Sequence, residues 1–70
     1  MNFQDALEEW RRANEEARVA ENVLSRMWQD YIDKRGPAPD SSQITEVNAL
    51  RRVANDKLAR AASAVNNMRP

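Results

Sequence analysis

The chain has 70 residues and a mass of 8.0 kDa, with 41% hydrophobic and 31% charged residues and a formal net charge of zero. This length holds one small domain, which excludes a multidomain enzyme. Cysteine and histidine are absent, which excludes a disulfide and removes the usual ligands of zinc and haem and the usual general base near neutral pH. We therefore expect no cofactor, no bound metal and no enzymatic activity.

The first half of the chain carries a heptad pattern that predicts a helix over about residues 3–35. Asn2 can cap its first turn, Gly36 can adopt the left-handed conformation that ends a helix, and Pro37 prevents continuation. All nine seam positions are apolar: Phe3, Ala6, Trp10, Ala13, Ala17, Ala20, Leu24, Met27 and Tyr31.

Residues 36–40 contain two prolines and form a stiff turn of a length typical of an antiparallel helix pair. A second helix is expected over about residues 41–67, with Asp40 or Ser42 as its cap; with Asp40, Gln43 would be the reciprocal partner. Seven of its eight seam positions are apolar, and Arg51 is the exception: Ile44, Val47, Arg51, Ala54, Leu58, Ala61, Val65 and Met68.

These elements predict an all-α fold, an antiparallel two-helix hairpin of coiled-coil type that forms one domain over residues 1–70. Residues 1–35 carry a net charge of −2 and residues 36–70 a net charge of +2, which favours this pairing. Folding at the turn places residues whose numbers sum to about 75 opposite one another, so that Ala20 meets Ala54 and Ala17 meets Leu58. The expected hairpin core is Phe3, Trp10, Ala13, Ala17, Ala20, Leu24, Met27, Tyr31, Ile44, Val47, Ala54, Leu58, Ala61 and Val65.

Both helices carry more apolar residues than one seam can bury. A wide apolar arc is typical of bundles of three or more helices, so we expect two hairpins to form a homodimeric four-helix bundle. The expected interface residues lie on the flanks of the seams: Leu7, Val23, Trp28, Ile32, Leu50 and Val53. Trp28 is expected to carry the largest share of the binding energy.

The leading functional hypothesis is a non-catalytic protein–protein interaction module that self-associates through an apolar helical face. One alternative is a chaperone or adaptor that binds a helix of a different protein. In architecture alone the hairpin resembles small helical-hairpin chaperones and adaptors. A second alternative is a small nucleic-acid-associated regulator, although the cations of the second helix (Arg51, Arg52, Lys57 and Arg60) point in at least three directions.

Several other patterns have ordinary structural interpretations. The glutamates of the first helix lie three or four residues from arginines, as in solvated ion pairs, and no serine has a base to activate it. Arg51 and Asn14 lie near the seams, where they either extend to solvent or set the register. No small-molecule ligand is evident. The first five residues do not resemble a signal peptide, and no stretch approaches the ~20 apolar residues of a membrane span, so a cytoplasmic protein is expected.

Overall fold

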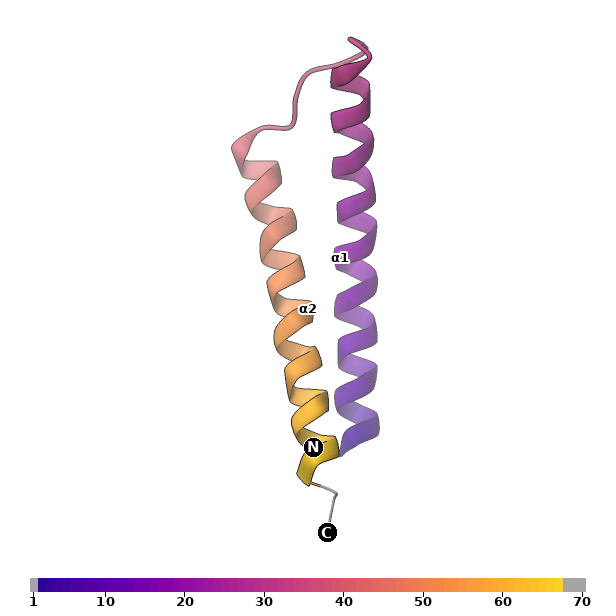
Figure 1. Cartoon of the computed structure of the whole chain (residues 1–70), viewed down its shortest axis with the longest axis vertical. Coiled ribbons are helices and arrows are strands. Elements are labelled where there is room, and N and C mark those ends of the chain that lie inside the picture. The colour runs from indigo at the N-terminus through magenta and orange to yellow at the C-terminus, as the bar shows by residue number, and fades with distance from the viewer. Residues whose placement is uncertain (1, 68–70) are drawn as a thin grey trace.

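The computed structural model describes residues 2–67, which form two antiparallel helices packed side by side (Figure 1). Helix α1 spans Phe3–Ile32 and helix α2 spans Ser41–Asn67. The hairpin is a rod with extents of 57 × 16 × 14 Å. The predicted all-α, two-helix hairpin is confirmed. Within the described part of the chain, neither helix combines the length and the apolar character needed to cross a membrane.

Helix α1 begins at the predicted cap. The backbone N–H of Asp5 donates a hydrogen bond of 2.8 Å to Oδ1 of Asn2, whose own backbone is extended. This bond satisfies one of the four N–H groups that the first turn of any helix leaves without a partner.

Helix α1 ends three residues earlier than predicted. The left-handed residue that follows the helix is not Gly36. The N–H of Lys34 donates to the carbonyl of Tyr31 (3.1 Å) and the N–H of Arg35 to that of Asp30 (2.7 Å), the two bonds of a Schellman motif. Lys34 takes the left-handed conformation, with φ of 62°, whereas Gly36 has no positive φ. A Schellman motif centred on Gly36 would need an N–H from Pro37, which has none.

This ending makes Lys34 and Gly36 a matched pair for substitution. Lys34→Gly is expected to stabilise the fold by about 0.5–1 kcal/mol, because glycine adopts a positive φ without the steric cost that a Cβ imposes. Gly36→Ala is expected to be neutral or slightly stabilising, since its new Cβ would lie 3.9 Å from Cβ of Asp30, an ordinary contact. Urea unfolding at one fixed chain concentration measures both changes. The interpretation fails if Gly36→Ala is the damaging substitution.

Helix α2 begins with the predicted reciprocal cap. The N–H of Gln43 donates to Oδ1 of Asp40 (2.8 Å), and the N–H of Asp40 donates to Oε1 of Gln43 (2.9 Å). This capping box places the first helical residue at Ser41, as expected from the sequence. The last residue of the predicted ladder, Met68, lies outside the described residues.

The register of the two helices differs from the expected one by about one turn. Ala17 packs with Ala54 in the central cluster, so facing residue numbers sum to about 71 and not 75. A shift of four residues is about 6 Å along the helix axis. The cause is the connection over residues 33–40, which runs back alongside the end of α1 before α2 starts, so that α1 extends beyond α2 (Figure 1).

The shift removes two residues from the expected core. Tyr31 is 51% exposed, because it lies where α1 extends beyond α2. Leu58 is 46% exposed, because the shifted register places Ala54 opposite Ala17, where Leu58 was expected.

Alanine dominates what remains of the core. The buried residues of the two helices are Ala6, Ala13, Ala17, Ala54 and Ala61. Ala6, and Pro39 in the connection, were not in the expected core although both are buried. The other expected core residues are half-buried: Phe3, Trp10, Ala20, Leu24, Met27, Ile44, Val47 and Val65. The helices therefore approach closely through small side chains, and the large ones lie at the edges of the seam.

Candidate interaction surface

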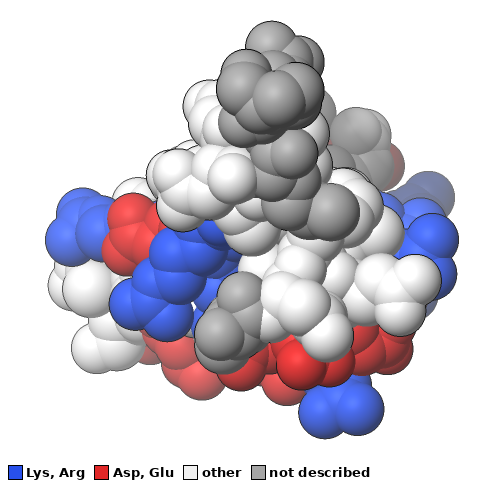
Figure 2. Space-filling view, turned by 90° about the horizontal axis from the view of Figure 1, so that it is seen from below, with Lys and Arg blue, Asp and Glu red and all other residues white. Residues whose placement is uncertain are grey.

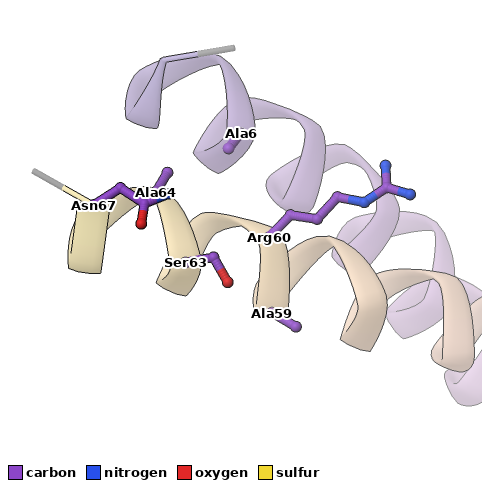
Figure 3. A pocket seen from close by; sticks show the side chains of 6 residues that line it. All are labelled: Ala6, Ala59, Arg60, Ser63, Ala64 and Asn67. Atoms are coloured by element: carbon purple, nitrogen blue, oxygen red, sulfur yellow. The ribbon is translucent and has the colours of Figure 1, made fainter.

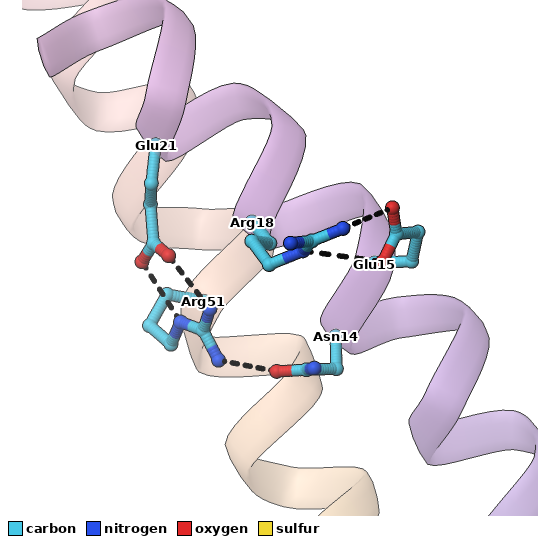
Figure 4. Close-up of polar contacts among 5 residues, drawn as sticks. All are labelled: Asn14, Glu15, Arg18, Glu21 and Arg51. Carbon is cyan, nitrogen blue, oxygen red and sulfur yellow. Dashed lines mark hydrogen bonds and ion pairs between the residues drawn. The ribbon is translucent and has the colours of Figure 1, made fainter.

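A polar clamp joins the helices near the middle of the hairpin (Figure 4). Arg51 of α2 donates from Nε and Nη2 to the two carboxylate oxygens of Glu21, at 2.8 and 2.7 Å, and from Nη1 to Oδ1 of Asn14 at 2.9 Å. Asn14 and Glu21 are seven residues apart and share one face of α1. Because a guanidinium is a rigid fork, the two hydrogen bonds to Glu21 are geometrically specific.

The clamp was predicted only in part. Arg51 and Asn14 stood out in the sequence as polar residues near the seams, but Glu21 did not, because it looks like one of many surface glutamates. The signal that could have found it is the spacing of seven between Asn14 and Glu21, which places two acceptors on one face opposite a single cation.

The clamp alters the ionisation of both charged partners. The hydrogen bond from Arg51, with its positive charge, holds the pKa of Glu21 below its ordinary value of 4.5, against a smaller upward effect of burial. The same hydrogen bond raises the pKa of Arg51. Glu21 therefore binds its proton less readily in the folded chain than in the unfolded chain, and its contribution to stability is present above its ordinary pKa and is lost as the pH falls.

A pH series tests the clamp. Wild type is expected to be more stable than Glu21→Gln at neutral pH, and the difference should shrink as the pH falls below 4.5, because protonation removes the charge that Arg51 binds. Thermal unfolding of both proteins measures the difference directly. In an Arg51→Met background the same substitution should show no such pH dependence. A difference that is equal at neutral and acid pH would contradict the role of the clamp.

Other ion pairs occupy the remaining helix surfaces. Lys57 of α2 lies 4.0 Å from Glu9 of α1, the second pair between the helices. Arg18 binds Glu15 at 2.9 Å within α1. The pKa of Glu15 is lowered by its hydrogen bond and charge interaction with Arg18. The Glu15–Arg18 contact agrees with the structural interpretation of the glutamates that was drawn from their spacing.

One flank of the hairpin, the valine flank, exposes Val19 and Val23 of α1 and Val53 of α2, each about half exposed. Val23 lines a groove of about 240 Å³ between the helices, beside Leu24, Met27 and Val47. Val19 and Val23 also line a second groove of about 310 Å³ along α1. Val23 and Val53 thus each border a hollow that is lined by residues of both helices.

A second apolar surface, the aromatic end, consists of Trp28, Tyr31 and Ile32 in the last turns of α1. The rings of Trp28 and Tyr31 meet edge to face, with centroids 6.1 Å apart and an interplanar angle of 76°. Trp28 is 40% exposed and Ile32 68% exposed. At 100° per residue, Trp28 lies about 140° around α1 from Val23.

The structure therefore divides the six expected interface residues. Val23 and Val53 belong to the valine flank, and Trp28 and Ile32 to the aromatic end. Leu50 is half-buried and packs against the alanine cluster, and Leu7 is half-buried at the start of α1. One flat interface cannot cover both Val23 and Trp28, because they face away from each other around α1.

A hollow of about 470 Å³ lies where the start of α1 meets the end of α2 (Figure 3). Its walls are Ala6, Ala59, Arg60, Ser63, Ala64 and Asn67. Figure 3 shows that Arg60 extends away from Ser63 and Asn67, so the polar groups that line this hollow do not converge on one point. Within residues 2–67 no group of acidic side chains is arranged to hold a metal ion.

The charged side chains do not form one basic surface at this end of the molecule. Viewed along the long axis, basic side chains lie in separate groups at the two sides and below, and acidic side chains follow the lower edge (Figure 2). Of the four cations in α2, Arg51 is bound to Glu21, and Lys57 lies at the longer distance of 4.0 Å from Glu9.

Comparison of the chain with models of protein families, with curated proteins and with solved structures finds no match in any of the three. The geometry of the surfaces described above is therefore the basis for the functional argument.

Proposed function

We propose that the protein is a non-catalytic interaction module that self-associates, two hairpins forming a four-helix bundle. The observation that carries this proposal is the composition of the core. Only alanines are fully buried in the helices of one hairpin, while large side chains such as Val19, Val23, Trp28, Ile32 and Val53 remain exposed. Burial of apolar side chains is the main favourable contribution to folding, and alanine supplies the least of it.

The surface area of the chain supports the same proposal. The hairpin exposes 5570 Å², whereas a folded monomer of 8.0 kDa exposes about 4,450 Å². The excess of about 1,100 Å² is larger than the ~800 Å² that each partner buries in a standard stable interface. The radius of gyration of 16.1 Å, against about 11 Å for a compact domain of this length, reflects the same elongated shape.

The test is the mass of the purified chain in solution. Light scattering coupled to size exclusion should give about twice 8.0 kDa, and the melting temperature should rise with chain concentration, as mass action requires of a dimer with a weak monomer. A monomer whose melting temperature is independent of concentration would refute the proposal.

The aromatic end favours one alternative, an adaptor that binds a helix of another protein. Aromatic side chains are typical anchors of protein–protein interfaces, and Trp28 and Tyr31 are exposed in the last turns of α1. A monomeric mass would favour this function over self-association. The nucleic-acid alternative has less support, because Arg51 is bound to Glu21.

A further inference from the structure

An outer stripe of six residues runs along α1 on the side of the valine flank. The residues are separated alternately by four and three positions, so that they lie within about 80° of arc around the helix. In order they are Arg12, Glu16, Val19, Val23, Arg26 and Asp30. Four of them line the groove along α1, and Arg12 and Glu16 line the adjoining hollow beside Val53.

The outer stripe is complementary to itself when reversed. Residues whose numbers sum to 42 form three pairs: Val19 with Val23, Glu16 with Arg26, and Arg12 with Asp30. Each pair joins either two apolar side chains or two opposite charges. Among residues 2–67, Glu16, Arg26 and Asp30 take part in no ion pair, and the Arg12 contact with Glu8 is long at 4.0 Å. Their charges are thus available to a second chain.

We propose that the occupant of this surface is a second copy of the chain, docked antiparallel on the outer stripe of α1 about a two-fold axis level with residue 21. This inference rests on the self-association proposed above and specifies its surface and orientation. A two-fold axis makes every contact occur twice, so Val19 and Val23 form a central apolar pair of contacts. The two charge pairs, also doubled, flank it on both sides.

The opposite orientation is unfavourable on the same surface. In a parallel dimer each residue would face its own equivalent, which places Glu16 against Glu16 and Arg26 against Arg26. Like charges directly opposite one another destabilise an interface and select against that arrangement. The outer stripe therefore determines the relative orientation of the two chains as well as the choice of partner.

Helix α2 adds apolar surface near the same axis. Leu50 lines the groove between the helices together with Ala20 and Val23, which places it close to the level of residue 21. In the antiparallel dimer the two copies of Leu50 approach the axis, and Val53 borders the same side. The flank that both helices present thus has an apolar centre and a charged rim, as stable interfaces do.

Charge reversal tests the pairing. Glu16→Arg and Arg26→Glu should each weaken self-association about tenfold at low salt, because each replaces two attractive contacts per dimer with two repulsive ones. The double variant Glu16→Arg/Arg26→Glu should restore wild-type association, since the charges are exchanged across the axis. Sedimentation equilibrium measures all four proteins, and the differences should diminish at high salt.

The controls carry the same charge changes elsewhere. Asp56→Arg and Arg52→Glu alter exposed positions on the outer side of α2 and should leave association within about twofold of wild type. If wild type dimerises and the stripe variants behave like these controls, the docking surface is wrong and self-association stands. If wild type is monomeric, self-association itself fails, and this inference fails with it.

Disulfide trapping tests the orientation independently. The chain has no cysteine, so a disulfide can form only between the introduced cysteines of two chains. A mixture of Val19→Cys and Val23→Cys chains should form a mixed disulfide faster than either variant forms its own, because residue 19 faces residue 23 in the antiparallel dimer. Faster formation of the two symmetric disulfides than of the mixed one would contradict the antiparallel arrangement and indicate a parallel dimer.

Discussion

Ala17→Leu is expected to destabilise the protein by about 3 kcal/mol, the upper part of the range for overpacking a core. Ala17 and Ala54 are both 0% exposed and pack in one cluster with Ala13. The three added carbons have no free volume to enter, so the helices must separate along the whole seam. A domain of this size rarely has more than about 3–5 kcal/mol of stability, and most of it would be lost.

The measurement is urea unfolding followed by circular dichroism, at the same chain concentration for every variant. Ala49→Leu is the matched control, because it adds the same atoms at an exposed position of α2, and it should change stability by less than about 0.5 kcal/mol. If Ala17→Leu were as stable as Ala49→Leu, the close approach of the helices at Ala17 and Ala54 would be contradicted.

Val23→Asp is expected to weaken self-association by about a hundredfold or more. Val23 lies at the centre of the proposed interface and is present twice in the dimer, so that two carboxylates would be desolvated against apolar neighbours. Central interface residues commonly account for about 2 kcal/mol or more each. Because Val23 is 56% exposed in the hairpin, the substitution should leave the fold of a single chain largely intact.

The matched control is Trp28→Ala, on the other flank of α1. The sequence alone favoured Trp28 as the main anchor of a dimer, whereas its place about 140° around α1 from Val23 predicts little effect on self-association. Sedimentation equilibrium of both variants separates the two interpretations. If Trp28→Ala lost self-association and Val23→Asp did not, the interface would lie at the aromatic end and not on the valine flank.

The sequence by itself determined the helices and most of their ends. The heptad ladder, the Asn2 cap and the reciprocal bonds of Asp40 and Gln43 all depend on residues within one or two turns of each other. Such local interactions can be read from spacing alone, because the geometry of a helix is the same in every protein. The same helical spacing predicted that the alanines at 13, 17, 54 and 61 belong to the core, and all four are buried.

The tertiary structure decided the register of the two helices and the contacts between them. Lys34 takes the left-handed conformation where Gly36 was expected to, and the connection then shifts α2 by one turn toward the start of α1. Arg51 reaches across to Glu21 and Asn14, and Leu58 is left 46% exposed. These outcomes depend on contacts between residues 30 to 37 positions apart in the chain. Helical periodicity leaves the relative shift and rotation of two helices undetermined until such contacts form.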